Sequence, residues 1–332
     1  MIITRTPLRI SFAGGGSDLP AFYEQEQGAV LSTAIDKYIY ITVNPKFDHK
    51  IRASYSITEI VDNVEELQHE LIREALYLLD IRQGIEITSI SDIPHQGTGL
   101  GSSSSYTVGL LNALYAYKGH MAGAERLAAE ACHIEIDRCR KPIGKQDQYI
   151  AAYGGLQYIR FNSDGSVFTD PLVCSSKIRQ QLEARLLLLY TGLTRRADDI
   201  LVEQSQETRT NEDKRVSLRR MVSMASEMCE ALGREDIDAF GEILHAGWLE
   251  KRKLATNISN RQIDDWYERA RVAGAIGGKL LGAGGGGFLL LYADPAFHAQ
   301  ICRALPELRP ISFNFCPQGS KVIYVEENGY KP

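Results

Sequence analysis

The stretch PHQGTGLGSSSS, residues Pro94–Ser105, decides the fold of this chain. Three glycines alternate there with small or apolar residues, and four serines follow them. A β-branched run with strand-like alternation, Ile85–Ile90, precedes the stretch, and a run of good helix formers through Leu114 follows it. The order of strand, glycine loop and helix start is an arrangement that binds phosphate groups.

Two properties of such a loop favour an anion. Glycines let the backbone come close to the ligand, and the free N–H groups of the first helical turn point at it, at the positive end of the helix dipole. Serine hydroxyls can cap the helix, contact a phosphate oxygen or ligate Mg²⁺. Alone, the pattern also fits a structural turn, because it lacks the Gly-Lys-Ser/Thr ending of the common nucleotide loop and the GxGxxG spacing of dinucleotide-binding proteins.

Length and composition set the broad class. The chain has 332 residues, which predicts two domains, and its 44% hydrophobic and 24% charged residues are typical of a soluble globular protein. A net charge of -5 argues against a broad nucleic-acid surface, and no apolar run is long enough for a bilayer. The N-terminus has no signal-peptide pattern and the six cysteines form no CxxC pair, so we expect a cytoplasmic protein with reduced thiols and no zinc site.

The N-terminal segment contains a second glycine-rich stretch. Ile2–Ala13 alternates with a period of two and predicts a strand that enters the turn Gly14–Asp18. This turn is either a flexible connection or a loop close to a ligand, where Asp18 would accept hydrogen bonds from hydroxyl groups. Arg9 stands mid-strand among apolar neighbours, so it lies either on the polar face or beside a buried carboxylate.

Other patterns lie around the phosphate loop. Glu135 falls on a predicted helix, where spacing alone does not separate a solvated glutamate from a metal ligand. Asp147 lies in GKQDQY (Gly144–Tyr149), after Pro142 has ended that helix, and by itself resembles a surface-turn aspartate. The periodicities predict a strand over Ala29–Val43 with an interruption near Asp36–Lys37, helices over Val64–Leu79 and Ala122–Cys139, and a strand over Leu156–Phe161.

The character of the sequence changes near residue 170, which predicts a boundary between residues 1–170 and 171–332. The second part contains a polar stretch that reads as helical, Asp199–Leu232, and the basic cluster Lys251–Lys253, which is either a solvated face or an anion site. Its third glycine-rich stretch, Gly277–Gly287, has seven glycines in eleven residues and leads directly into the apolar strand Phe288–Tyr292. A loop of this kind is expected to approach a ligand or another loop.

Taken together, the glycine-rich stretches resemble the three motifs of the GHMP kinases, the small-molecule kinases that include galactokinase, homoserine kinase and mevalonate kinase. The matching segments are TPLRISFAGGGSD (Thr6–Asp18), PHQGTGLGSSS (Pro94–Ser104) and GGKLLGAGGGG (Gly277–Gly287), and GKQDQY resembles the segment with the catalytic aspartate. The resemblance implies a two-domain α/β and α+β fold: an S5-like N-terminal domain, a ferredoxin-like C-terminal domain, and an active site between them.

The resemblance also implies roles for single residues. Asp147 is the expected base for the attacking hydroxyl, and Arg9 is its expected basic partner. Glu135, Ser102 and Ser103 are the expected Mg²⁺ ligands, although the Glu135–Asp147 spacing is about one residue longer than in mevalonate kinase. The expected contacts to the phosphates of ATP are Gly97, Gly99, Leu100, Gly101, Ser102, Ser103 and Ser104. The expected substrate contacts are Gly15, Gly16, Ser17, Asp18, Gly284 and Gly285.

Within the family, AGGGSDLPAFY (Ala13–Tyr23) most resembles the kinases acting on heptose 7-phosphate, and more distantly the L-fucokinases. The former phosphorylate the anomeric hydroxyl to give the 1,7-bisphosphate on the way to GDP-linked heptose. A sugar phosphate needs cations, and the candidates are Arg195, Arg196, Lys251 and Arg252, with the first two favoured because TGLTRRADDI also resembles this branch. Two alternatives stay open: a kinase for an unphosphorylated sugar, and a catalytically silent sugar-binding member. The expected partner is a small molecule, with no nucleic acid or membrane involved and the oligomeric state left open.

Overall fold

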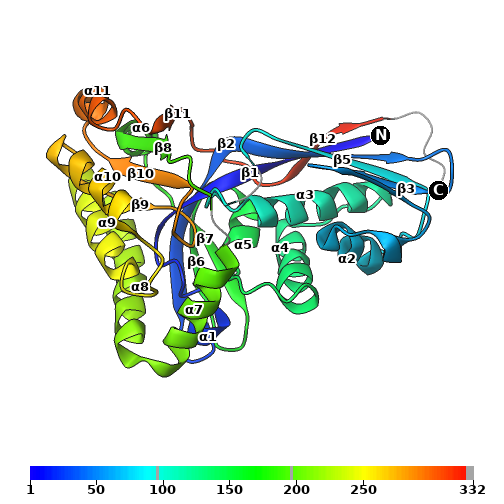
Figure 1. Cartoon of the computed structure of the whole chain (residues 1–332), viewed down its shortest axis with the longest axis horizontal. Helices are drawn as coiled ribbons and strands as arrows, with labels where there is room; N and C mark the ends of the chain where they lie inside the picture. The colour runs from blue at the N-terminus through cyan, green and yellow to red at the C-terminus, as the bar shows by residue number, and fades with distance from the viewer. Residues whose placement is uncertain (95–96, 195–196, 327–332) are drawn as a thin grey trace.

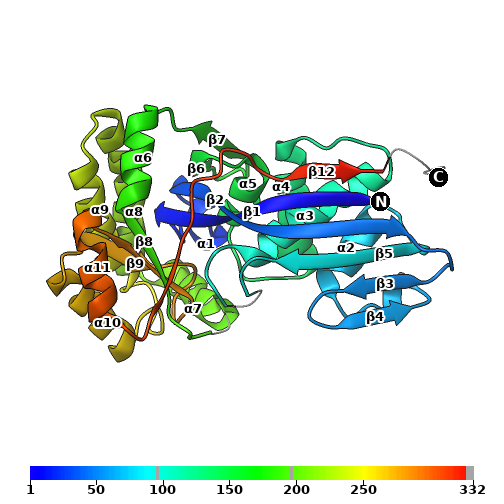
Figure 2. The ribbon, with the colours of Figure 1, turned by 90° about the horizontal axis from the view of Figure 1, so that it is seen from above.

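In the computed structural model, which describes residues 1–94, 97–194 and 197–326, the chain forms two β-sheets with helices packed against each (Figure 1). The larger sheet lies in the half that contains the N-terminus, and the smaller sheet lies in the other half (Figure 2). The expectation of a two-domain α/β fold is confirmed. Among the described residues, no helix combines the length and hydrophobicity that crossing a membrane would require.

The larger sheet has eight strands in the order β12-β1-β2-β5-β3-β4, and β6 and β7 extend it from β2. All its neighbouring pairs are antiparallel except β3 with β5. Its strands are β1 (Ile2–Ala13), β2 (Gly28–Pro45), β3 (Ile51–Ser54), β4 (Thr58–Val61), β5 (Ile85–Ser91), β6 (Leu156–Phe161), β7 (Val167–Pro171) and β12 (Lys321–Val325).

The longest strand, β2, carries the interruption expected near Asp36–Lys37. Its register against β1 jumps there, from Ile35 opposite Leu8 to Tyr38 opposite Pro7. The two extra residues form a bulge, and β2 changes its other neighbour across it, from β6 to β5. The bulge thus lets one strand serve two parts of the sheet.

Helices of the first half lie beneath the larger sheet in Figure 1, with α3 against β1 and β2. The phosphate loop connects β5 to α3, as the sequence predicts. The helical segments of this half are α1 (Pro20–Tyr23), the 3₁₀ turn η1 (Val64–Glu66), α2 (Glu70–Leu78), α3 (Ser102–Tyr117), α4 (Ala124–Cys132), the π-helical turn η2 (His133–Arg138) and α5 (Gln146–Tyr153).

The smaller sheet has the order β11-β8-β10-β9 and is entirely antiparallel. Its strands are β8 (Leu186–Tyr190), β9 (Gly277–Leu280), β10 (Phe288–Tyr292) and β11 (Arg309–Ile311). The helices of this half are α6 (Ser176–Arg185), α7 (Ala197–Thr210), α8 (Glu212–Gly233), α9 (Ile237–Lys251), α10 (Arg261–Val272) and α11 (Pro295–Ala304).

The helical stretch expected over Asp199–Leu232 is confirmed. It is divided into two helices at Asn211, whose side chain caps α8 by accepting a hydrogen bond from the Asp213 N–H. In the first half, the helix expected from Val64 begins only at Glu70, after the 3₁₀ turn.

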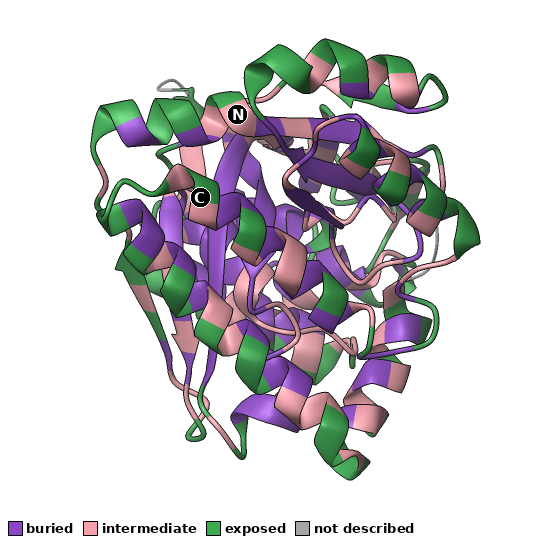
Figure 3. Ribbon diagram, turned by 90° about the vertical axis from the view of Figure 1, so that its left-hand side faces the viewer, coloured by how far each residue is buried: buried purple, intermediate pink, exposed green. Residues whose placement is uncertain are grey.

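The two halves share a hydrophobic core. Strand residues of the first sheet cluster with residues of β8, α9 and β10. The central strands are buried, and many of the helices alternate buried with exposed residues along their length (Figure 3). Strand β12, from the end of the chain, pairs with β1 in the first sheet. The boundary expected near residue 170 stays a prediction.

Candidate active site

The phosphate loop ends at the start of α3 in a left-handed turn. Gly101 is the N-cap with φ of 75°, and Gly97 and Gly99 also have positive φ, of 67° and 76°. Only glycine adopts this backbone at low cost. The loop therefore needs its glycines, and the N-terminus of α3, with exposed Ser103, opens onto a cavity.

This cavity, which we call the outer compartment, brings together most of the residues expected to contact phosphate. It is lined by Gly97, Gly99, Gly101, Ser102, Ser103 and Ser104, together with Thr98, Lys141, Ile143, Ala197, Asp198, Arg9, Asp147, Gly282 and Ala283. Leu100 differs, because its side chain is fully buried in the core and its carbonyl accepts a hydrogen bond from the Arg9 N–H. This hydrogen bond, together with the buried Leu100 side chain, fixes the phosphate loop to β1.

Arg9 and Asp147 form a bidentate ion pair at the floor of this compartment. Arg9 Nε and Nη2 donate to the two carboxylate oxygens of Asp147 at 2.7 Å each, and Nη1 donates to the carbonyl of Gly99 at 2.5 Å. Arg9 is 4% exposed, so of the two positions that the sequence allowed, the polar face or beside a buried carboxylate, the structure shows the second. The guanidinium thus links the aspartate to the phosphate loop.

Asp147 lies in the first turn of α5, not in a surface turn. The N-terminus of a helix favours a carboxylate there. Its side chain is 23% exposed and faces cavities on both sides, because it lines the outer compartment and a second cavity deeper in the protein. Arg9, Ile143, Gly282 and Ala283 also line both cavities.

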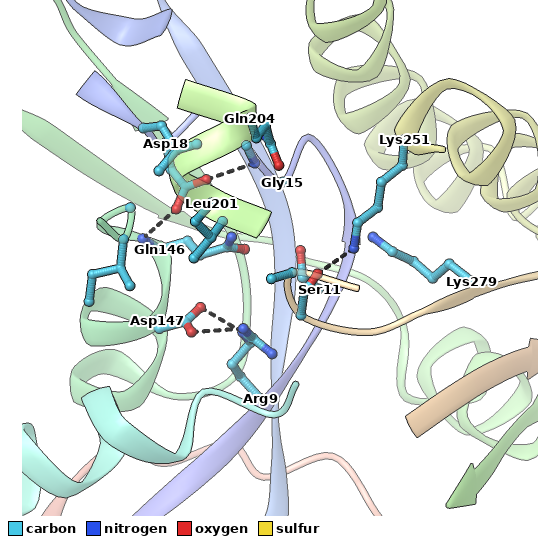
Figure 4. Close-up of a pocket in the computed structure, with 16 residues that line it drawn as sticks. Arg9, Ser11, Gly15, Asp18, Gln146, Asp147, Leu201, Gln204, Lys251 and Lys279 are labelled. Carbon is cyan, nitrogen blue, oxygen red and sulfur yellow. Dashed lines mark hydrogen bonds and ion pairs between the residues drawn. The ribbon is translucent and has the colours of Figure 1, made fainter. Parts of the chain in front are cut away.

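We call the second cavity the inner compartment (Figure 4). Besides the shared residues it is lined by Ser11, Gly15, Gly16, Asp18, Leu19, Gly144, Gln146, Leu201, Gln204, Lys251 and Lys279. Three expected substrate contacts, Gly15, Gly16 and Asp18, therefore face this space. Ser17 is not among the lining residues; its hydroxyl donates to the carbonyls of Gly14 and Ala29 and holds the loop in place.

Asp18 is almost completely buried at the wall of the inner compartment. Its two oxygens accept hydrogen bonds from the backbone N–H groups of Gly16 and Gln146, at 2.9 and 3.2 Å. Burial raises the pKa of Asp18, the Gly16 N–H lowers it, and the charge of Asp147 raises it further. A side chain on Gly144 would place its Cβ 1.9 Å from Asp18 Oδ2, so this glycine makes room for the carboxylate.

Three buried polar atoms around the inner compartment have no hydrogen-bond partner among the residues that the structure describes. They are Ser11 Oγ, Gln146 Oε1 and Gln204 Nε2. Buried polar groups are normally satisfied, so unpartnered ones that line a cavity indicate a polar ligand. Gln204 was not predicted from the sequence, because it lies on α7, far from the glycine-rich stretches. Ser11 and Gln146 lie within TPLRISFAGGGSD and GKQDQY, but no role was predicted for either of them.

Two buried lysines also face the inner compartment. Lys251 is 6% and Lys279 is 4% exposed, and within the described ranges their ammonium groups donate to backbone carbonyls only. The basic cluster at Lys251–Lys253 is therefore divided: Lys251 points inward, while Arg252 pairs with Asp264 at 3.0 Å and lies outside the lining of both compartments. Arg195 and Arg196 lie outside the described residues.

Glu135 lies behind the phosphate loop on the π-helical turn η2. Its carboxylate is completely buried; Ser103 Oγ donates to Oε1 at 2.7 Å and Gln148 Nε2 donates to Oε2 at 2.6 Å. Two ligands at neighbouring corners of a Mg²⁺ octahedron are about 3 Å apart, at Mg–O distances of about 2.1 Å. The separation of Ser103 Oγ and Glu135 Oε1 therefore fits a shared cation beside Ser103, which lines the outer compartment, whereas the buried Glu135 does not line it.

The third glycine-rich stretch packs directly on the phosphate loop. A Cβ on Gly282 would lie 2.4 Å from the Cα of Gly99, and one on Gly99 would lie 2.5 Å from the carbonyl oxygen of Leu281. Gly282 and Ala283 line both compartments. The expected contacts Gly284 and Gly285 lie further along: Gly284 backs onto Ile258, and the Gly285 N–H donates to the carbonyl of Ile258.

A third cavity adjoins the outer compartment through Ser102 and Ser103. Its other lining residues are Tyr55, Ser56, His69, Leu71, Ser89, Pro94, Tyr106 and Thr194. The His69 ring lies 4.5 Å from that of Tyr55 and 5.2 Å from that of Tyr106, and burial lowers the pKa of His69. The aromatic cluster of Tyr55, His69 and Tyr106 was not predicted from the sequence, because the three residues come from separate segments of the chain.

The arrangement as a whole can bring a phosphate donor and a hydroxyl acceptor together. The outer compartment offers glycine N–H groups and serine hydroxyls, which suit phosphate oxygens. The inner compartment offers the carboxylate, amide and ammonium groups that suit a hydroxyl-rich, charged ligand. The two meet at Asp147, where a hydroxyl from one side and a phosphoryl group from the other can come into line.

Two family models match the chain. The model of the GHMP kinases N terminal domain matches residues 62–155, and the model of GHMP kinases C terminal matches residues 228–308. Together the matched segments take in more than half of the chain.

Similar proteins extend the likeness to nearly the whole length. The chain is 30% identical to D-glycero-alpha-D-manno-heptose 7-phosphate kinase of Campylobacter jejuni, across 96% of this chain and 98% of the relative. It is 27% identical to L-fucokinase/L-fucose-1-P guanylyltransferase of Bacteroides fragilis, across 92% of this chain but 36% of that longer protein. A solved D-glycero-D-manno-heptose 1-phosphate kinase from Bacteroides thetaiotaomicron superposes with a TM-score of 0.81 at 25% identity, across 98% of this chain and 100% of that one.

Proposed function

Because the chain belongs to the GHMP kinase family and is a sugar kinase that uses ATP, we propose that its substrate is D-glycero-D-manno-heptose 7-phosphate. In this proposal the acceptor is the anomeric hydroxyl, and the product is the 1,7-bisphosphate. The relatives named above support the heptose phosphate, since both the Campylobacter and the Bacteroides thetaiotaomicron proteins are named for one.

The observation that carries the proposal is the meeting of the two compartments at the Arg9–Asp147 pair. The transferred phosphoryl group would enter from the phosphate loop, and the sugar would lie in the inner compartment with its acceptor hydroxyl beside Asp147. Asp147 would orient this hydroxyl and accept its proton as the new bond forms. Arg9 holds the carboxylate in place and keeps a positive charge near the transferred group.

Recognition of the sugar would depend on the inner compartment. Asp18 presents a buried carboxylate there, and the unpartnered Ser11 Oγ, Gln146 Oε1 and Gln204 Nε2 can each form a hydrogen bond with a sugar hydroxyl. Gly15 and Gly16 leave space for the ring. The site would be specific for sugars whose hydroxyls reach these groups. Each group is already desolvated, so binding a sugar that leaves one of them without a hydrogen-bond partner costs free energy.

Mg²⁺ would be held by Ser103 Oγ and Glu135 Oε1, which fit a common cation. When bound, it would neutralise charge on the donor phosphates. The base of the nucleotide would occupy the third cavity, against the aromatic side chains of Tyr55, His69 and Tyr106, because aromatic rings stack on a purine. Ser102 and Ser103 connect that cavity to the phosphate loop.

The test is ADP release with Mg-ATP over a panel of acceptors: D-glycero-D-manno-heptose 7-phosphate, sedoheptulose 7-phosphate, mannose 6-phosphate, L-fucose, galactose and mevalonate. We expect turnover of the heptose phosphate, with an acid-labile product whose phosphorus-31 spectrum shows an anomeric phosphate. Preferred turnover of L-fucose or galactose would favour a kinase for an unphosphorylated sugar. Bound ATP without turnover of any acceptor would favour a silent sugar-binding protein.

A further inference from the structure

The two buried lysines of the inner compartment are the charged groups that the proposed chemistry does not use. Lys251 Nζ donates to the carbonyl oxygens of Leu280, at 3.2 Å, and Gly282, and Lys279 Nζ donates to the carbonyl oxygen of Phe12 at 3.0 Å. Within the described part of the chain neither lysine forms an ion pair. An ammonium group has three N–H donors, so Lys251 keeps one to spare and Lys279 keeps two.

Burying two ammonium groups side by side costs free energy unless an anion binds between them. A buried ammonium without a counter-charge loses several kcal/mol of hydration, and two of them close together also repel each other. Helix α9 and strand β9 nevertheless direct both side chains to one cavity. A dianionic group there would recover the lost hydration through charge-assisted hydrogen bonds from the three spare donors.

The position of the lysines distinguishes two possible sources of this anion. Both line the inner compartment, and neither is among the lining residues of the outer compartment, where the phosphate loop lies. Figure 4 draws them across the cavity from Asp147 and Asp18. The phosphoryl group under transfer would lie beside Asp147, whereas a phosphate at the remote end of the sugar would lie on the side of the lysines.

We infer that Lys251 and Lys279 together form the anchor for the phosphate that the sugar already carries, at the end of the molecule remote from its acceptor hydroxyl. The inference rests on the proposed function and deepens it, because it makes the inner compartment selective for phosphorylated sugars. The distance between Asp147 and the two lysines would then select substrates by the distance between their acceptor hydroxyl and their phosphate.

The protonation of the lysines gives an independent readout. Burial, followed by the positive charge of Arg9, lowers the pKa of Lys251 to about 7, although Asp18 acts in the opposite direction. Burial also lowers the pKa of Lys279, and the charges of Lys251 and Arg9 add to the effect. A phosphate monoester, with a second pKa near 6, is already dianionic at about pH 8. Binding at that pH should therefore draw protons onto the lysines.

The first experiment compares KM and kcat for D-glycero-D-manno-heptose 7-phosphate and for unphosphorylated D-glycero-D-manno-heptose. We expect Lys279→Met and Lys251→Met each to raise KM for the phosphorylated sugar about 10- to 100-fold, as loss of a charge-assisted hydrogen bond does. KM for the unphosphorylated sugar should stay within a few-fold. The matched control is Lys253→Met, two residues from Lys251 but exposed and paired with Glu250.

The second experiment needs no variant. Calorimetric titration of the wild-type protein at about pH 8, in two buffers of different ionisation enthalpy, should show proton uptake with the phosphorylated heptose and none with the unphosphorylated sugar. Lys251→Met should take up fewer protons. Absence of uptake by the wild type would overturn the inference even if the variants failed to fold.

The remaining outcomes separate this inference from the proposed function. An equal rise in KM for both sugars, or a fall in kcat with KM unchanged, would overturn the anchor and place the lysines with the transferred group or the fold. Turnover by the wild type of unphosphorylated sugars alone would contradict the proposed function itself. Heptose phosphate turnover with unaffected lysine variants would contradict the anchor and leave the proposed function standing.

Discussion

A single carboxylate, Asp147, lies where the two compartments meet, and its removal should separate binding from chemistry. Asn at this position keeps an oxygen for Arg9 but cannot take a proton. We expect Asp147→Asn to lower kcat about 10²- to 10⁴-fold, the usual contribution of a general base, with ATP affinity within a few-fold of wild type. Asp170→Asn, which removes an exposed carboxylate paired with Arg160, is the control. Near-full turnover by Asp147→Asn would contradict its role.

Because the Glu135 carboxyl is buried, we expect the free energy of unfolding to depend on pH. Desolvation raises its pKa above the ordinary value of 4.5, and hydrogen bonds from Ser103, Ser104 and Gln148 offset part of the rise. Below pH 4.5 the carboxyl is protonated in both states. As pH rises through the interval up to the raised pKa, the unfolded chain ionises first, so the folded state loses stability; above the interval the penalty is constant.

Glu135→Gln stays neutral and can still bond to Ser103 and Gln148. Its free energy of unfolding relative to wild type should therefore grow across that interval and then stay level, in denaturant titrations at a series of pH values without Mg²⁺. Glu24→Gln, at an exposed position, is the control. A difference from wild type that is the same at all pH values would show that burial of the charge is not its cause.

At the scale of elements, two loops from distant parts of the sequence touch through backbone atoms. Ala at Gly282 would bring its Cβ 2.4 Å from Gly99 Cα and would also adopt φ of 68°. We expect Gly282→Ala to cost clearly more than the ~1 kcal/mol of left-handed strain and to abolish turnover, because the phosphate loop must move.

Gly119 supplies the matched control for the loop contact. Its φ of 76° is nearly the same, but a Cβ there meets no atom within 4 Å. Gly119→Ala should therefore pay only the backbone strain, measured as a small fall in the free energy of unfolding, with kcat unchanged. Equal losses in the two variants would mean that the contact between the loops contributes nothing.

Local sequence patterns predicted the helices and strands whose formation depends on neighbouring residues. They did not predict elements and site residues whose position depends on packing against distant segments. The strand–loop–helix order around Gly97–Gly101 is local, and it is confirmed. Helix α5 was missed because its face is set by packing against α3 and α4, not by its own short pattern. Lys279 and Gln204 were missed for the same reason: each is an ordinary residue until the fold turns it toward the inner compartment.

At the scale of the whole molecule, the two halves are held by one core. Phe12, at the end of β1, is 1% exposed, and its ring centroid lies 5.1 Å from that of Phe240 on α9. Strand β12 returns from the second half to pair with β1. Residues of both halves line the inner compartment, so this shared core keeps Arg9, on β1, at a fixed place relative to Lys251, on α9.

Phe12 tests whether the halves unfold together. Both tryptophans of the chain, Trp248 and Trp266, are buried in the second half, so their fluorescence reports on that half alone. We expect Phe12→Ala to lower the free energy of unfolding by about 3–5 kcal/mol and to shift the tryptophan and far-ultraviolet circular dichroism transitions by the same amount. Phe168→Ala, at a position 53% exposed on β7, should shift neither. If Phe12→Ala moved the dichroism transition but left the tryptophan transition in place, the halves would unfold separately, and the shared core would not be what fixes the geometry of the site.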